Sequence, residues 1–197
     1  MSSTSVPPDA ERIRAFVALD LDAESTRRIA RLSDRLRGST GAPAATWISP
    51  QQVHLTLKFL GDAATPRVAH LSEAVAAVAR GTPRLRAAAI RVNGLPTLQH
   101  ARVVVAAVDD PDGHLEGLAG RIEDLCADLG FARESRAFRP HITLARLKRP
   151  CDTRSWLRPD LAAASGDVLP TCLVIYRSVL DAAGARYFPL ARFELTG

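Results

Sequence analysis

Two short polar motifs in this sequence contain the residue types of an acid and base site. His54-Leu-Thr56 is followed by leucine, and 87 residues later His141-Ile-Thr143 is followed by leucine as well. An imidazole has an unperturbed pKa of about 6.5, so at neutral pH one ring can accept a proton while another donates one. A threonine hydroxyl can donate a hydrogen bond to an oxygen of an anion. The two motifs therefore indicate chemistry on an anionic group.

Two opposed histidines supply the base and the acid that the opening of a cyclic phosphodiester needs. A base takes a proton from water, an acid protonates the departing ribose oxygen, and the two act on opposite sides of the phosphorus. Neither motif has an Asp, Glu or Cys at ligand spacing, and two histidines with two threonines are a poor set of ligands for a divalent metal. We therefore predict a reaction without metal or cofactor.

Strands are expected to position these side chains. Residues 53–60 and 139–146 both alternate polar and apolar side chains, as half-buried strands do. Residues two apart on a strand point to the same side, so His54 and Thr56 share one face while the leucines pack on the other. If a pseudo-two-fold axis relates the two strands, both motifs face one groove.

The rest of the chain repeats the same order of elements. A shift of 87 residues superimposes Val17 on Val104 as well as His54 on His141. The expected strands are 13–19, 53–60, 85–92, 101–108, 139–146, 173–180 and 186–195, and the expected helices are 22–36, 67–80 and 115–129. The pattern predicts an α+β fold of two βαββ-like halves, because two copies of this length favour a two-lobed domain over a solenoid.

Composition indicates an ordinary globular protein. Of 197 residues, 47% are hydrophobic and 24% charged, and no apolar run reaches the roughly 20 residues of a membrane span. The cysteines, which number three, predict neither a disulfide framework nor a zinc site. We expect residues 11–197 to form one domain in the cytoplasm, preceded by a disordered extension at residues 1–10.

The positive charge is concentrated around the second motif. The net charge is +5, and one stretch holds Arg133, Arg136, Arg139, Arg146, Lys148 and Arg149 against Glu134. Such a concentration beside the expected anion site favours a polyanionic partner such as RNA, although a solvated face is the alternative.

The two motifs resemble the paired signatures of the two-histidine (2H) phosphoesterase superfamily. With RAFVAL at 14–19, HLTLKFLG at 54–61 and FRPHITLAR at 138–146, the chain is similar from about residue 12 to 195 to the RNA 2′,3′-cyclic phosphodiesterase branch, historically called 2′-5′ RNA ligases. The resemblance implies a bilobed fold, with two antiparallel β-sheets lining a central groove and helices packed outside. It also implies hydrolysis of a terminal 2′,3′-cyclic phosphate of RNA to a 2′-phosphate, with reversible 2′-5′ ligation as a further activity.

By the same resemblance, His54 donates a proton to the departing 3′-oxygen, His141 activates water, and Thr56 and Thr143 hold the phosphate. The residues five places after the histidines, Phe59 and Arg146, can sandwich a nucleobase. In a regular strand this offset places them on the face away from the histidines, so a bulge or a strand end has to permit the role.

Arg139 and Lys58 are further candidates for substrate contacts. Arg139 is basic and precedes the second motif. Lys58 lies four residues after His54, so a regular strand would place both side chains on the same face. A solvated lysine is the alternative for Lys58.

Other functions are compatible with parts of this pattern. The substrate could be a 2′-5′-linked oligonucleotide or ADP-ribose 1″,2″-cyclic phosphate. A nucleotide-binding module without turnover is expected to have lost one of the four motif residues, and all four are present. A general RNA-binding protein is expected to have more aromatic residues than the 5% found here. We therefore predict a monomeric enzyme that acts on RNA, with tRNA fragments among the candidate substrates and no membrane partner.

Overall fold

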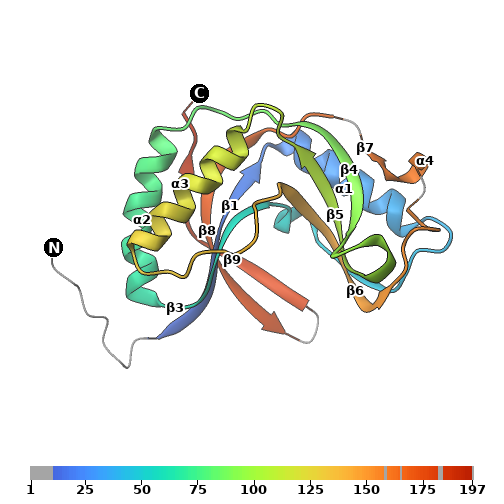
Figure 1. Cartoon of the computed structure of the whole chain (residues 1–197), viewed down its shortest axis with the longest axis horizontal. Helices are drawn as coiled ribbons and strands as arrows, with labels where there is room; N and C mark the ends of the chain where they lie inside the picture. Colours follow the sequence, from blue (N-terminus) through green and yellow to red (C-terminus); the bar gives the residue numbers. More distant parts are fainter. Residues whose placement is uncertain (1–10, 158, 165, 182–183, 197) are drawn as a thin grey trace.

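The computed structural model describes residues 11–157, 159–164, 166–181 and 184–196, and the extension predicted at 1–10 lies outside this part. Figure 1 shows the chain from end to end. Its strands are β1 (Arg12–Leu21), β2 (Ala45–Trp47), β3 (Leu55–Ala64), β4 (Ala88–Leu95), β5 (Ala101–Asp109), β6 (His141–Cys151), β7 (Ala163–Ala164), β8 (Pro170–Asp181) and β9 (Gly184–Glu194). Its α-helices are α1 (Ala23–Arg37), α2 (Thr65–Arg80), α3 (His114–Asp128) and the short α4 (Pro159–Ala162).

The strands form two groups that meet at one point. The hydrogen-bonded order is β7-β4-β5-β6-β3-β1-β8-β9, with β2 paired to β6. The join between β3 and β6 consists of a single antiparallel pair, Leu55 with Ile142. The two sheets predicted from the sequence are therefore two halves of one continuous sheet, which bends where this pair joins them.

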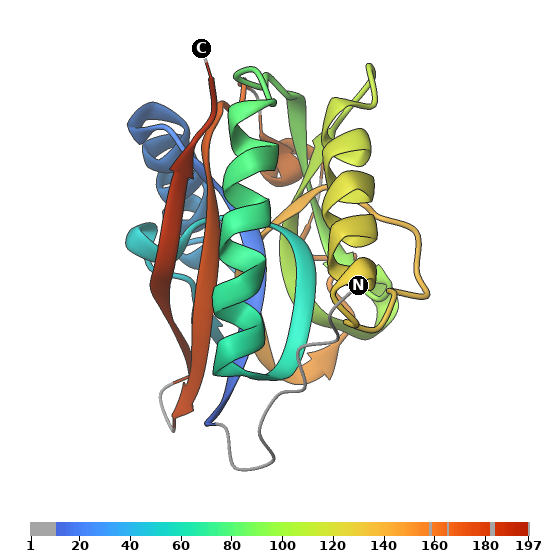
Figure 2. The same ribbon diagram turned by 90° about the vertical axis from the view of Figure 1, so that its left-hand side faces the viewer.

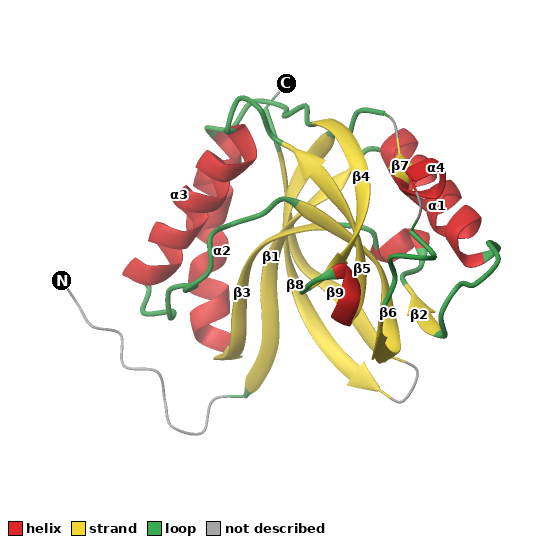
Figure 3. Cartoon of the chain, turned by 45° about the vertical axis from the view of Figure 1, so that its right-hand side comes forward, coloured by secondary structure: helices red, strands yellow, loops and turns green. Residues whose placement is uncertain are grey.

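Helices cover the outer faces of both halves, as predicted. In Figure 3, α2 and α3 lie on one flank of the strands and α1 and α4 on the other. Figure 2 shows α2 and α3 side by side over the first half of the sheet. The helix of each repeat covers the strands of the other half, since α1 contacts β6 and α3 contacts β3.

Strand β1 shows how the sheet separates its two faces. Val17 and Leu19 are fully buried in the large core beneath the helices. Phe16 and Ala18 point to the opposite face, where they pack with Tyr176 in a second, smaller cluster. The central strand of the first half is thus buried on both sides, which explains its nearly continuous apolar sequence. The face with Phe16 is the one that carries the polar motifs.

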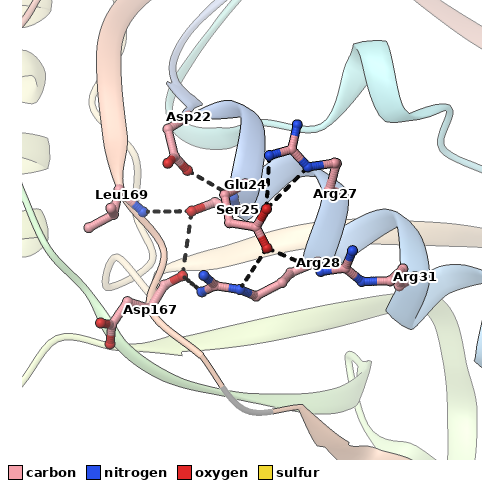
Figure 4. Close-up of polar contacts among 8 residues, drawn as sticks. All are labelled: Asp22, Glu24, Ser25, Arg27, Arg28, Arg31, Asp167 and Leu169. Carbon is pink, nitrogen blue, oxygen red and sulfur yellow. Dashed lines mark hydrogen bonds and ion pairs between the residues drawn. The ribbon is translucent and has the colours of Figure 1, made fainter.

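Polar contacts fix the start of α1 to the segment leading into β8 (Figure 4). Asp22 caps the helix by accepting a hydrogen bond from the Ser25 N–H at 2.8 Å. The Ser25 hydroxyl accepts from the Leu169 N–H at 3.1 Å, and Arg28 donates to the Asp167 carbonyl at 2.8 Å. These contacts hold the first repeat against the last strands of the chain.

Most elements agree with the sequence prediction. The strand expected at 85–92 is found as β4 at Ala88–Leu95, while β2, β7, α4 and two 3-10 turns were not anticipated. The cysteines at 126, 151 and 172 are free thiols. Within the described residues, none of the helices is both long and apolar enough to span a bilayer.

Candidate active site

The two motifs meet across the join between the halves. Leu55 pairs with Ile142, and these are the middle residues of the two His-x-Thr motifs. Continuing this antiparallel register by one residue in each direction places His54 beside Thr143 and Thr56 beside His141. The pseudo-two-fold axis therefore passes between the motifs, and all four polar side chains share one face. The structure brings together the four residues that the sequence predicted.

Both imidazoles are oriented by the same local contact. His54 Nδ1–H donates to the Gln52 carbonyl at 2.8 Å, and His141 Nδ1–H donates to the Arg139 carbonyl at 2.8 Å. A carbonyl can only accept, so each ring carries a proton on Nδ1, and the neutral form of such a ring has its lone pair on Nε2. Each ring thus has Nε2 available for proton transfer. Arg139, predicted to bind substrate, contributes its backbone carbonyl here, and its side chain is exposed.

Two matched bulges decide which residues join the motifs on this face. Val17 pairs with Lys58 and Ala18 with Thr56, so Leu57 is an extra residue of β3. In the second half, Val104 pairs with Ala145 and Val105 with Thr143, so Leu144 is the extra residue of β6. Each bulge lies one residue beyond a motif threonine and inverts the alternation after it. The predicted need for a bulge is met in both halves.

The bulges turn Phe59 and Arg146 toward the motif face. Phe59 pairs with Phe16, whose ring centroid lies 5.0 Å from that of His54. Arg146 pairs with Val103 of β5. Val103 lies two residues before Val105, the partner of Thr143, so Arg146 and Thr143 point to the same face of the sheet. Both side chains are exposed, and Phe59 is 57% accessible although it is a large apolar residue. This placement is compatible with the predicted contact to a nucleobase.

The same inversion shows that the expectation for Lys58 is wrong. Lys58 is 4% exposed and its Nζ lies 2.9 Å from the Glu123 carboxylate on α3. It also donates to the Ala132 carbonyl at 2.6 Å. The bulge at Leu57 turns Lys58 to the helix side of the sheet, where it is neither a phosphate contact nor solvated.

His54 lies among aromatic rings. The rings of Phe16, Tyr176 and Tyr187 have centroids 5.0, 5.7 and 5.1 Å from the His54 ring. Burial lowers the pKa of His54 from its usual value to about 4. The hydrogen bond to Gln52 and the charge of Asp20 oppose this shift, while the charges of Arg146 and His141 add to it. His54 is therefore neutral in the free protein at neutral pH.

Sequence reasoning missed a polar network beside His54. Tyr176 Oη–H donates to Asp20 Oδ1 at 2.7 Å, and Arg192 forms an ion pair with the same carboxylate. Asp20 and Tyr176 are 9% and 5% exposed. Burial and the contact with Asp20 raise the pKa of Tyr176, so its hydroxyl stays protonated and donates. The sequence could have indicated this network, because Asp20 lies two residues after Ala18 and four after Phe16 on one strand. Residues at these spacings point to the same face of a sheet.

The basic stretch divides into two parts. Arg133 pairs with Asp124 at 2.8 Å on the side of α3, whereas Arg136 and Arg139 have exposed side chains in the loop before β6. Within the part of the chain that the structure describes, no group of three or more His, Cys, Asp or Glu side chains could hold a metal ion. The metal-free reaction stays a prediction.

The neutral state of His54 predicts a specific dependence of stability on pH. The pKa of this ring is about 4 in the folded chain and near its usual 6.5 when unfolded, so the unfolded chain binds the proton more tightly. The contribution to the unfolding free energy is complete above about pH 6.5 and is lost as the pH falls toward about 4, by up to about 3 kcal/mol.

Urea unfolding in phosphate-free buffer at several pH values measures this contribution. The His54→Gln variant is the control, because it lacks the titrating ring and shares every other group. The difference in unfolding free energy between the wild type and the variant should shrink as the pH is lowered. Parallel curves would show that His54 is not buried in its neutral form.

Comparisons with known proteins point to one family. A family model described as the 2′-5′ RNA ligase superfamily matches residues 15–171. A protein of Geobacillus stearothermophilus named RNA 2′,3′-cyclic phosphodiesterase is 30% identical over 190 residues, which cover 95% of this chain and 59% of that protein. The chain thus spans little more than half the length of this relative. A protein of the same name from Methanothermobacter thermautotrophicus is 27% identical and is covered over its whole length.

Solved structures with the same fold include two bacterial proteins. TT0787 of Thermus thermophilus superimposes with a TM-score of 0.77 at 26% identity, covering 94% of this chain and 99% of that one. Escherichia coli LigT complexed with 3′-AMP superimposes with a TM-score of 0.72 at 26% identity, covering 95% of this chain and 100% of that one. These similarities confirm the fold predicted from the sequence.

Proposed function

Because this chain belongs to the 2′-5′ RNA ligase superfamily, we propose that it hydrolyses the 2′,3′-cyclic phosphate at the end of an RNA chain, with His54 and His141 as general acid and base. Several relatives bear the name RNA 2′,3′-cyclic phosphodiesterase, which agrees with the activity predicted from the motifs. The observation that carries the proposal is the pairing of the two motifs about Leu55 and Ile142.

This pairing suits an in-line displacement at phosphorus. A phosphate on the pseudo-two-fold axis has one imidazole on each side and one threonine hydroxyl next to each imidazole. His141 Nε2 accepts a proton from water as the water oxygen bonds to phosphorus. The bond from phosphorus to the 3′-oxygen breaks, and His54 Nε2–H donates its proton to that oxygen. The products are a 2′-phosphate and a free 3′-hydroxyl. Thr56 and Thr143 donate hydrogen bonds to the non-bridging oxygens.

The substrate itself supplies a reason for His54 to become protonated. Its ring is neutral in the free protein because it is partly buried among aromatic side chains. A phosphodiester anion placed against the ring favours the imidazolium form, because an opposite charge nearby raises the pKa of a histidine. Binding of the substrate is therefore coupled to uptake of a proton.

In the proposed complex, the terminal base lies between Phe59 and Arg146. Their pseudo-equivalent positions flank the paired motifs from the two halves, and both side chains are exposed on the motif face. An aromatic ring and a guanidinium bind any nucleobase by stacking, so this contact does not select a sequence. Arg136 and Arg139 in the loop before β6 can interact with the RNA backbone by charge. The predicted cytoplasmic location and monomeric state stay predictions.

The direct test is hydrolysis of a short RNA that ends in a 2′,3′-cyclic phosphate, in the presence of excess EDTA. We expect complete conversion to a 2′-phosphate, identified by phosphorus NMR, at the rate observed without EDTA. A product with a 3′-phosphate would reverse the assigned leaving oxygen. Loss of activity with EDTA that zinc or magnesium restores would contradict the metal-free mechanism, and absence of turnover on any cyclic phosphate would indicate a nucleotide-binding module.

A further inference from the structure

The two histidines occupy equivalent positions but have different partners across the neighbouring strand. Leu19 pairs with Leu55 in the first half, and one further step in this register places Asp20 beside His54. Ala107 pairs directly with His141 in the second half. Asp20 and Ala107 are related by the same 87-residue shift that relates the histidines. The near-symmetric site thus has a carboxylate beside one imidazole and a methyl group beside the other.

We propose that Asp20 is a positioning residue whose carboxylate makes His54, rather than His141, the ring that carries the transferable proton. This inference rests on the proposed function, in which one histidine is the acid and the other the base. Directly opposed residues on one face of an antiparallel pair have Cβ atoms about 5 Å apart, so the carboxylate and the imidazole interact through a short distance.

Asp20 acts through its charge and not through a hydrogen bond to His54 Nδ1. That nitrogen donates to the Gln52 carbonyl, and the Asp20 carboxylate accepts from Tyr176 and pairs with Arg192. Tyr176 also contacts the His54 ring, and its ring stacks on Phe16 at a centroid distance of 5.2 Å. The network therefore holds the carboxylate in place while leaving Nε2 of His54 free to face the substrate.

The charges around His54 act in opposite directions. The titratable groups around it are Asp20 from β1, Tyr176 from β8, Tyr187 from β9, and His141 and Arg146 from β6. Arg192 from β9 pairs with the Asp20 carboxylate. Burial and the positive groups oppose protonation of His54, and Asp20 favours it. An anionic substrate adds to the effect of Asp20 at the moment of binding. Without the carboxylate, burial and the positive groups oppose protonation of His54 more strongly, so the ring is less able to serve as the acid.

The test is an NMR titration of the two histidine rings in the full chain, with saturating inorganic phosphate and without it. Asp20→Asn should lower the pKa of His54 in the phosphate-bound protein by roughly one unit, with a smaller effect on His141. Asp20→Glu should restore most of the shift, because it returns the charge. Tyr176→Phe keeps the carboxylate and should change the His54 pKa less than Asp20→Asn does.

A complementary variant introduces the missing charge in the other half. Ala107→Asp should raise the pKa of His141 by a similar amount relative to Ala107→Asn, which has the same size and no charge. This comparison does not depend on removing anything from the Asp20 network. Should either new side chain prevent folding, the Asp20 variants by themselves decide the proposal.

The pH dependence of kcat provides the functional readout. The alkaline limb reports the acid in the enzyme–substrate complex. Asp20→Asn should move this limb down by about one unit, so that kcat falls roughly tenfold on the alkaline side and changes little below it. An unmoved limb, a uniform loss at every pH, or movement of the acidic limb instead would overturn the proposal. The titrations remain decisive if the wild type hydrolyses no cyclic phosphate, so failure of the proposed function is distinguishable.

Discussion

Replacing His54 or His141 by asparagine is expected to lower kcat on a 2′,3′-cyclic phosphate by at least about 10²-fold, the scale of losing a general acid or base. Asparagine retains an amide donor near the position of Nδ1, so the contact with the Gln52 or Arg139 carbonyl can persist while Nε2 is lost. The loss should therefore appear in kcat more than in KM, because the motif threonines and the base contacts remain.

The double variant distinguishes a concerted pair from two independent contributions. If both rings act in one transition state, His54→Asn with His141→Asn should be little slower than the slower single variant, since residues that act as a unit are not additive. His70→Asn is the matched control, because His70 is exposed on α2 and outside both motifs. Full activity in either single variant, with circular dichroism showing an intact fold, would rule out the two-histidine mechanism.

Replacing Glu123 by alanine is expected to destabilise the fold by about 3 kcal/mol, because it leaves the buried ammonium of Lys58 without its charged partner. Lys58→Met should cost less, since the Glu123 side chain is 21% exposed and can be hydrated when its partner is removed. Urea unfolding at neutral pH measures both. The double variant should recover part of the loss caused by Glu123→Ala, because no unpaired charge remains.

Two control measurements test whether the effect of Glu123→Ala comes from the buried position of Lys58. Asp62→Ala removes an exposed partner of Arg12 and should cost little, because exposed ion pairs contribute weakly. Lys58→Met should keep kcat within a few-fold of the wild type, since Lys58 lies on the helix side of the sheet. A large loss of kcat in a well-folded Lys58→Met variant would contradict the inverted parity described above.

Much of the fold could be predicted because its signals are local. Alternation of polar and apolar residues identified the strands that carry the motifs, and helical periodicity identified α1, α2 and α3. The four motif residues could be recognised because their types and spacing recur after 87 residues. Short elements such as β2 and β7 were not predicted. They form by pairing with distant strands, and they have too few residues to show an alternation of polar and apolar side chains.

The bulges at Leu57 and Leu144 could not be predicted from local pattern. An extra residue in a strand leaves hydrophobic alternation almost unchanged, yet it reverses the face of every residue that follows. For this reason the sequence placed Lys58 on the wrong face and left Phe59 and Arg146 unresolved. Only the register against β1 and β5 decides these positions.

By itself, the sequence determined the chemistry available: a repeated pair of imidazoles and hydroxyls, with a basic stretch beside the second. The tertiary structure decided how the two histidines differ. Their motifs are nearly identical, but strand pairing sets Asp20 beside His54 and Ala107 beside His141. The proton affinity of each ring depends on burial and on charges that come from strands far away in the chain, and no local sequence pattern contains that information.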